Sequence, residues 1–207
     1  MSRVNSPPAQ HVAGDRRTHI LDCAERLVAV RGFDRVRLRD VATEAGVSIG
    51  SLQHLFETRD QLLRETFRHS ASRRVERWLQ AATVDGDPWD RLAGLLAAAM
   101  DERAFRARSA IWLEFASAAS RDEELRRVMA TVYDAWRVPM RSAIADGVAA
   151  GTFAPVIDVD SIVDLLSTQI DGMEIAVTIE ASGMEFPRLA ELVLDSARTM
   201  LGMRPTD

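Results

Sequence analysis

Small and polar side chains that can form hydrogen bonds lie close together between residues 48 and 54. Ser51, Gln53 and His54 could donate and accept hydrogen bonds at the edges of nucleic-acid bases. A glutamine such as Gln53 can form two of these bonds with an adenine. Ser48 lies at the start of the same segment, and Gly50 adds to its small and polar surface. We therefore expect these five residues to face the major groove of double-stranded DNA.

Two short helices joined by a tight turn would hold these side chains in position. Apolar residues follow the i, i+3, i+4 and i+7 spacing of one helical face, at Leu38, Val41, Ala42 and Ala45. Gly46 can adopt the left-handed conformation that ends this helix, and Ser48 is a favourable N-cap for the next. The second helix would turn its larger apolar side chains inward, namely Ile49, Leu52, Leu55 and Phe56. Residues 38–56 thus predict a helix-turn-helix, with an ordinary antiparallel helix pair as the alternative.

The segments on both sides of this helix pair extend the pattern. Residues 18–33 have the spacing of an amphipathic helix that closes at Gly32, and Thr58 can cap a further helix. This order of elements resembles the TetR family of bacterial transcription regulators over about residues 16–64. The matching residues are Gly32-Phe33, Val41-Ala42, Ala45-Gly46-Val47-Ser48, Phe56, and Thr58-Arg59-Asp60 with Leu62. The resemblance implies a helix-turn-helix DNA-binding domain at residues 13–58 and a ligand-binding and dimerisation domain at residues 59–207.

Three arginines near the expected DNA-facing surface could contact phosphates, namely Arg37, Arg39 and Arg59. Arg37 and Arg59 begin predicted helices, where unpaired backbone amides already attract an anion. Arg37 also stands where the family usually has a Ser or Thr that caps the helix. The alternative for each residue is a solvated side chain, or for Arg37 a pairing with Asp40 three residues along the chain.

The charge of the chain is compatible with DNA binding when its two parts are considered separately. All 26 basic residues are Arg, and the net charge is −5. Residues 1–60 contain 9 Arg and 8 acidic residues, a net charge of +1, whereas residues 61–207 contain 17 Arg and 23 acidic residues, a net charge of −6. DNA contact would therefore depend on where individual arginines and helix N-termini are placed.

The sequence has no feature of a membrane or secreted protein. No apolar run approaches the ~20 residues of a membrane span. Cys23 is the single cysteine and lies on the apolar side of its helix, which favours a small core residue over a redox sensor. Residues 1–12 lack the apolar core of a signal peptide and are expected to form a disordered tail. We therefore expect a cytoplasmic protein.

The rest of the chain has the spacing of helices with short breaks and shows no β pattern, which predicts an all-α fold of about nine helices. Ser120 is expected to cap the longest of them. The last two helices, over residues 159–181 and 186–201, carry wide apolar faces that could form a homodimer interface. The alternative is that both helices only complete the core. The candidate interface residues are Leu166, Ile170, Val177, Leu189, Leu192, Val193 and Met200.

Several segments of the C-terminal part look like the BetI-type subgroup of this family, which includes a choline-responsive repressor. They are Trp112-Leu113-Glu114-Phe115, Asp122-Glu123-Glu124-Leu125, Trp136-Arg137, Gly151-Thr152-Phe153 and Ile170-Asp171-Gly172. Aromatic, Met and acidic residues in and near these segments could line an effector cavity, although such residues at helical spacing are also typical of a plain core. The candidates are Trp112, Phe115, Tyr133, Trp136, Met140, Asp171, Met173 and Glu174, with Glu114 as a further polar anchor.

The chemistry of these candidates favours a hydrophobic or cationic small-molecule effector over a polyanion. A carboxylate beside aromatic rings can hold a cation, and the only cations expected nearby are Arg108, Arg137 and Arg141. We therefore expect a dimeric, sequence-specific transcriptional regulator, and in particular a repressor whose DNA affinity a small molecule lowers.

Two other classes of protein are the alternatives. An enzyme is disfavoured, because the 4 histidines show no metal-binding spacing and the sequence has no phosphate-binding loop or nucleophile elbow. No cofactor or metal is expected for the same reason. A dimeric helical interaction protein that has lost DNA binding is the remaining alternative, and a DNA-binding assay would separate it from a regulator.

Overall fold

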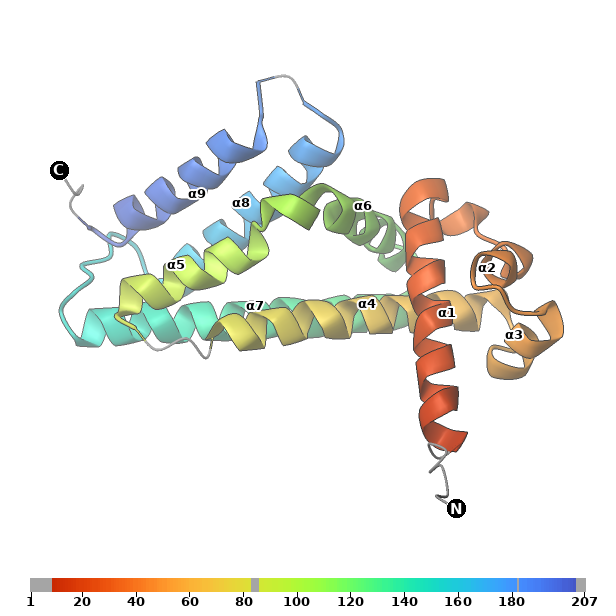
Figure 1. Ribbon diagram of the computed structural model, residues 1–207. Helices are drawn as coiled ribbons and strands as arrows, with labels where there is room; N and C mark the ends of the chain where they lie inside the picture. Colours follow the sequence, from red (N-terminus) through yellow and green to blue (C-terminus); the bar gives the residue numbers. More distant parts are fainter. Residues whose placement is uncertain (1–8, 83–85, 182, 204–207) are drawn as a thin grey trace, which may run out of the picture. The chain divides into compact units, whose positions relative to one another are not determined.

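The computed structural model describes residues 9–82, 86–181 and 183–203 of the chain. Within these ranges all regular secondary structure is helical, so the expected all-α fold is confirmed (Figure 1). The chain forms two compact units that divide after Ser70, inside the fourth α-helix. The elements, where η1 is a short 3-10 helix, are α1 (Ala9–Arg31), η1 (Phe33–Arg35), α2 (Leu38–Glu44), α3 (Ile49–Leu55), α4 (Arg59–Ala82), α5 (Pro88–Ala99), α6 (Glu102–Ala119), α7 (Glu123–Ala149), α8 (Val159–Thr178) and α9 (Phe186–Met200).

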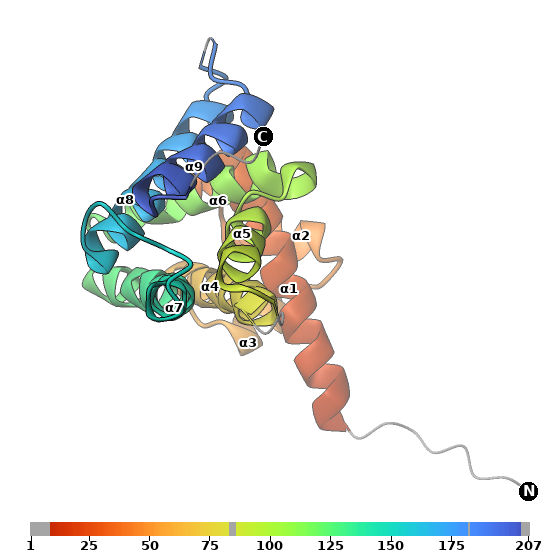
Figure 2. The ribbon, with the colours of Figure 1, turned by 90° about the vertical axis from the view of Figure 1, so that its left-hand side faces the viewer.

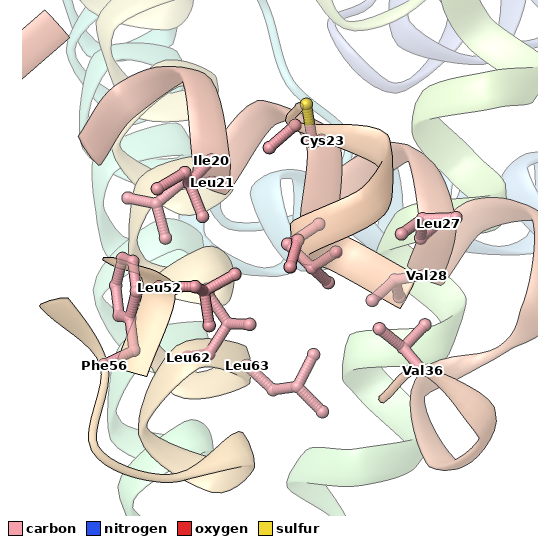
Figure 3. Packing of buried hydrophobic residues seen from close by; sticks show 14 residues of the cluster. Ile20, Leu21, Cys23, Leu27, Val28, Val36, Leu52, Phe56, Leu62 and Leu63 are labelled. Atoms are coloured by element: carbon pink, nitrogen blue, oxygen red, sulfur yellow. The ribbon is translucent and has the colours of Figure 1, made fainter. Parts of the chain in front are cut away.

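The N-terminal unit is built around one cluster of buried apolar side chains (Figure 3). Ile20 and Cys23 enter it from α1, Leu52 from α3, and Leu62 and Leu63 from the first turns of α4. Burying one such leucine or isoleucine side chain contributes about 1.5–3 kcal/mol. The cluster therefore holds α3 in place against α1 and the start of α4, and it includes Cys23 as a plain core residue.

The turn between α2 and α3 depends on two residues that the sequence singles out. Gly46 has a φ of 64°, in the left-handed region that other L-residues rarely adopt. Ser48 then caps α3, because its hydroxyl oxygen accepts a hydrogen bond from the Ser51 backbone N–H. The helix-turn-helix predicted for residues 38–56 is confirmed.

Some helices begin at residues other than those expected. α1 begins at Ala9, so it includes part of the segment expected as a disordered tail, and residues 1–8 lie outside the described ranges. The cap of α7 is Asp122 and not Ser120. The Asp122 carboxylate accepts hydrogen bonds from two backbone amides of the first turn, whereas the Ser120 hydroxyl donates to a carbonyl of α6. A carboxylate at the N-terminus of a helix also interacts favourably with the helix dipole, which explains the difference.

In the C-terminal unit α7 packs against α5, α6 and α8, and α8 in turn packs against α6 and α9 (Figure 2). Gly147 permits close contact between the backbone of α7 and the ring of the buried Phe153, because a Cβ at position 147 would overlap this ring. Pro139 lies inside α7, as the sequence predicts. Among the described helices, none has the length and apolar character needed to cross a membrane.

Candidate functional site

The solvent-facing side of α3 carries the side chains predicted to contact DNA. Gly50, Gln53 and His54 are exposed, and Ser51 is half-buried. The hydroxyl of Ser48 donates to the Ser51 hydroxyl oxygen at 2.9 Å, so the start of the helix is ordered by its own polar side chains. The five residues therefore lie together on α3 and its N-cap, and the opposite side of this helix is fixed in the core. Their contact with DNA stays a prediction.

Ile49 differs from its expected position. The sequence pattern places it in the core, but 41% of the residue is exposed and it does not belong to the core cluster. Ile49 is the first residue of α3, and the buried side of this helix begins one turn later at Leu52. An apolar side chain therefore lies exposed beside the small and polar ones. The helical spacing of Ile49 predicts burial. The prediction fails because this spacing does not show where the neighbouring helices end.

The start of α2 is capped without the Ser or Thr that the family usually has. The Arg37 backbone N–H donates to Asp40 Oδ2 at 3.0 Å, and Arg31 pairs with the other oxygen of Asp40 at 2.9 Å. The hydrogen bond from Arg37 and the nearby Arg31 guanidinium hold the pKa of the Asp40 carboxyl below its usual range. This contact uses the Arg37 backbone, and the Arg37 residue remains exposed. Arg39 is exposed as well.

Arg59 has a set of partners inside the N-terminal unit that the sequence did not predict. Its Nε donates to the Val36 carbonyl oxygen at 2.7 Å, and Nη2 donates to the Phe33 carbonyl oxygen at 2.5 Å. Nη1 lies 3.2 Å from Asp60 Oδ1. The guanidinium thus ties the start of α4 to η1 and the residue that follows it. This arrangement gives Arg59 a positioning role, and its contact with a phosphate stays a prediction.

In the C-terminal unit several predicted ligand-binding residues meet in a buried cluster. The Tyr133 hydroxyl of α7 donates to Asp171 Oδ2 of α8 at 2.7 Å. The ring of Tyr133 meets that of Trp112 of α6 edge to face, with 6.0 Å between centroids. Glu174 lies three residues after Asp171 and is 2% exposed. Trp136 packs against a further tryptophan, Trp78 of α4, with 4.9 Å between centroids.

Arg74 of α4, whose side chain is largely covered, joins these groups. Its side chain is 12% exposed and pairs with Glu174. Its Cζ lies 4.4 Å from the centre of the Trp112 ring and 5.2 Å from that of Trp78. The expectation that the only nearby cations are Arg108, Arg137 and Arg141 is therefore wrong. Arg137 and Arg141 pair with exposed carboxylates of α8, and Arg108 bonds to Ala99 and Asp101, which precede α6.

The spacing of apolar residues along α4 could have predicted that Arg74 lies on the inward face of this helix. It lies three residues after the buried Ala71 and four before the buried Trp78, so all three share one helical face. Residue type alone predicts an exposed position for Arg74, because an arginine is almost never buried unless it is paired. Its partner Glu174 is 100 residues further along the chain, and no local pattern links the two.

Burial decides the electrostatics of this cluster. It raises the pKa of the Glu174 and Asp171 carboxyls, and the Arg74 guanidinium opposes part of that rise for both. Burial and the hydrogen bond to Asp171 raise the pKa of Tyr133, so its hydroxyl remains a donor. The second oxygen of Glu174, Oε2, is buried and has no hydrogen-bond partner among the described residues. Such oxygens are nearly always paired in proteins.

The remaining ligand-binding candidates lie in other surroundings. Phe115 and Met140 are fully buried, and Glu114 is half-buried on α6. Met173 lines a different, largely apolar hollow of about 440 Å³ between α8 and α9, together with Leu192. The structure thus separates an aromatic and charged cluster from an apolar hollow, whereas the sequence predicts a single cavity for all the candidates.

Three of the residues assigned to a dimer interface are buried inside the chain. Leu166 is fully buried, and Ile170 and Val193 are each 4% exposed. Since α8 packs against α6, α7 and α9 of the same chain, its most apolar side enters the core. The assignment of these three residues to a dimer surface is therefore wrong, and for them the core alternative holds.

Other apolar side chains of the last two helices are exposed and could meet a partner. Leu192, one of the predicted interface residues, is 51% exposed, and Val177, Leu189 and Met200 are half-buried. Three apolar residues of α8 and its C-cap that were not assigned to the interface are also exposed. They are Leu165, Ile175 and Ile179.

Two family profiles match the chain. The profile described as "Bacterial regulatory proteins, tetR family" matches residues 20–66. The profile described as "BetI-type transcriptional repressor, C-terminal" matches residues 88–202. The first contains the complete helix-turn-helix, and the second contains α5 to α9. Each match therefore lies within one of the two compact units.

Individual proteins similar to this chain are regulators of the same kind. The chain is 28% identical to the HTH-type transcriptional regulator BetI of Rhizobium meliloti over 181 residues, which are 87% of this chain and 86% of that protein. It is 29% identical to the HTH-type transcriptional repressor KstR2 of Mycolicibacterium smegmatis over 157 residues, 75% of this chain and 76% of the relative. A solved transcriptional regulator from Saccharomonospora viridis, in complex with choline, superposes with a TM-score of 0.81 at 26% identity and covers 88% of this chain and 95% of its own. Because the BetI-type profile alone covers more than half of the sequence, the chain belongs to the TetR family and is a DNA-binding transcriptional regulator, not an enzyme.

Proposed function

We propose that the chain is a cytoplasmic, homodimeric repressor that leaves its operator when a hydrophobic or cationic small molecule binds the C-terminal unit. The observation that supports the choice of effector is the group of aromatic rings around the buried carboxylate of Glu174 and the half-buried carboxylate of Asp171, with Glu174 Oε2 lacking a partner among the described residues. A carboxylate next to Trp and Tyr rings is the surrounding in which proteins hold quaternary ammonium ions. The S. viridis structure in complex with choline supports this class of ligand.

DNA recognition is assigned to α3, with Gln53 as the residue that discriminates between bases. A bidentate pair between a glutamine and an adenine contributes about 1–3 kcal/mol of discrimination. Ser51 and His54 provide further polar contacts. The exposed Ile49 adds an apolar group that can contact a thymine methyl. Arg37 and Arg39, whose side chains are exposed at the start of α2, contact phosphates.

The helix α4 carries parts of both functions along one continuous element. Leu62 and Leu63, in its first two turns, belong to the core that holds α3 in place. Arg74, three turns later, pairs with Glu174 in the C-terminal unit. An effector that changes the surroundings of Arg74 therefore acts on the helix that supports the recognition helix. The size of the response is limited by the difference between the effector's affinities for the two states.

A second copy of the chain is needed to place two recognition helices in successive major grooves, which lie about 34–36 Å apart. We assign this contact to the exposed apolar side chains of α8, its C-cap and α9, among them Leu165, Ile175, Ile179 and Leu192. Isologous dimers bury the same patch on both copies, and apolar side chains of this size make such burial favourable.

The DNA-binding part is tested by selection of binding sites from a random-sequence DNA pool with the purified full chain. Enrichment of an inverted-repeat site, bound more tightly than random DNA in a gel shift, is the expected result. The dimer is checked by sedimentation of the protein–DNA complex. If no sequence is enriched and the protein is a dimer without affinity for DNA, it is a helical interaction protein and the proposed repressor function is wrong.

The effector part is tested by thermal-shift measurements with amphipathic cations, aromatic drugs, fatty acids and nucleotides. Cations or apolar molecules should stabilise the protein and release the selected DNA. Trp112→Leu should weaken this response and preserve DNA binding. Trp89→Leu is the matched control, because Trp89 packs under Arg198 and belongs to a different contact. If only nucleotides or acyl-CoA anions stabilise the protein, the assignment of the effector class is wrong.

A further inference from the structure

Arg74 occupies the buried cluster of the C-terminal unit in the way that a bound cation would. Its guanidinium lies over two indole rings, 4.4 Å from the centroid of Trp112 and 5.2 Å from that of Trp78. The same guanidinium pairs with the carboxylate of Glu174. Aromatic faces and a buried carboxylate are also the groups that hold an organic cation in a binding site. The guanidinium of Arg74 therefore places a positive charge from α4 where a cationic effector would bind.

The charges around this place favour an occupant that is positive. Glu174 is 2% exposed, and Asp171, which accepts a hydrogen bond from Tyr133, lies on the same helix. Arg74 cannot lose its proton at any ordinary pH, so its departure would leave Glu174 without the cation that pairs with it directly, with only the more distant charge of Arg108 acting on it. A second cation can restore the balance, whereas an anion would add to the negative charge. Glu174 Oε2 gives an incoming cation a free acceptor within the described part of the cluster.

We propose that Arg74 is a built-in occupant of the effector site, and that a cationic effector binds by replacing its guanidinium against Glu174 and the Trp112 ring. This inference rests on the proposed function for the class of the effector. It adds that the site is closed by the protein's own side chain until the effector enters. The exchange breaks the contact between α4 and α8 that Arg74 makes with Glu174, so binding is coupled to the position of α4 by the replacement itself.

The replacement predicts that removal of Arg74 increases the affinity for small cations. When a site is open for only a fraction of the time, the apparent dissociation constant rises by the inverse of that fraction. If Arg74 fills the site for about nine-tenths of the time, its removal strengthens binding about tenfold. If the effector instead needed Arg74 as part of its site, removal of Arg74 would weaken binding.

The experiment uses the full chain with Arg74→Ala and two probes, tetramethylammonium and methylguanidinium, followed by calorimetry and by tryptophan fluorescence. The variant should bind both probes at least about tenfold more tightly than the wild type. Millimolar methylguanidinium should also restore part of the thermal stability that the variant loses, because it reproduces the group that was removed. A slightly alkaline pH keeps Glu174 ionised, since burial raises the pKa of this carboxyl.

Two further variants make the test specific. Arg198→Ala removes another arginine that lies over a tryptophan, Trp89, at 4.7 Å, but its carboxylate partner Asp195 is exposed. This matched variant should show neither tighter binding nor rescue. Arg74→Lys keeps a cation at the position, and its affinity should stay near that of the wild type. Equal or weaker binding of both probes by Arg74→Ala, or equal rescue of Arg198→Ala, would overturn the proposal.

A measurement on the wild type covers the case in which Arg74→Ala does not fold. The Nε–Hε resonance of Arg74 in ¹⁵N-arginine-labelled protein is identified by its absence from Arg74→Lys. Titration with tetramethylammonium should move this resonance toward the position of an exposed arginine, and an unchanged resonance at saturation would contradict the replacement. None of these assays contains DNA. Release of the operator by a cation that leaves the Arg74 resonance unchanged would therefore overturn the replacement alone, whereas replacement without release would overturn only the proposed regulation.

Discussion

Replacing Arg59 by Ala separates the positioning role seen in the structure from a role in phosphate contact. The change removes the hydrogen bonds from Nε to the Val36 carbonyl and from Nη2 to the Phe33 carbonyl, at 2.7 and 2.5 Å. Hydrogen bonds from a charged donor contribute about 1.5–3 kcal/mol each when buried. The Arg59 side chain is 31% exposed, so water can replace part of both bonds. We therefore expect a total loss of about 1–3 kcal/mol in the free energy of unfolding.

The assay is urea unfolding of the full chain followed by circular dichroism, together with the salt dependence of operator binding. Arg39→Ala is the matched control, because Arg39 lies exposed on α2. It should leave the unfolding free energy unchanged and reduce the slope of log K against log salt by about 0.9, the effect of one phosphate contact. If Arg59→Ala unfolds at the same urea concentration as the wild type, the positioning argument is wrong. A loss of slope in Arg59→Ala would show that Arg59 also contacts a phosphate.

Three other predictions test separate parts of the molecule. Gln53→Ala should reduce the preference for operator over random DNA by about 1–3 kcal/mol without loss of fold, and an unchanged affinity ratio in competition gel shifts would contradict base recognition by Gln53. Gly147→Ala should cost about 1–3 kcal/mol in urea unfolding, because its Cβ would overlap a packed ring, whereas Gly94→Ala has open space and should be neutral or slightly stabilising. Glu174→Gln should gain stability relative to the wild type as the pH rises above about 4.3, the ordinary value for glutamate. The raised pKa of Glu174 means that the native state holds this proton more tightly than the unfolded state, so its ionisation lowers stability; a pH-independent difference between the two unfolding curves would show that this pKa is not raised.

The helix-turn-helix could be predicted from sequence because its determinants are local. Gly46 stops α2 through its own left-handed conformation, and Ser48 caps α3 through an amide three residues away. The buried positions Val41 and Leu52 follow from a spacing that repeats within single helices. None of these features needs knowledge of a residue far along the chain, so one sequence contains enough information to place them.

The features that the sequence did not reveal depend on which helix packs against which. An apolar face of α8 could equally well meet α6 of the same chain or a second copy, and only the fold shows that Leu166 belongs to the core. Ile49 has the period of a buried residue but lies where the core ends. The ion pair between Arg74 and Glu174 joins residues 100 positions apart. Each is of a residue type that is mostly exposed to solvent, so neither residue by itself predicts a buried pair.

The proposed replacement of Arg74 also limits what the effector can be. Breaking a buried ion pair by removing one partner costs about 3–5 kcal/mol. A bare cation regains a pairing with Glu174 and a contact with Trp112 of the same kind, so its exchange with Arg74 is nearly balanced and its net effect is small. A change of the population from 1:99 to 99:1 needs a difference of about 5.5 kcal/mol. At about 25 cal/mol per Å² this corresponds to roughly 220 Å² of additional apolar surface buried by the ligand. An effector that acts as a complete switch must therefore combine its cationic group with an apolar body that Arg74 does not itself supply.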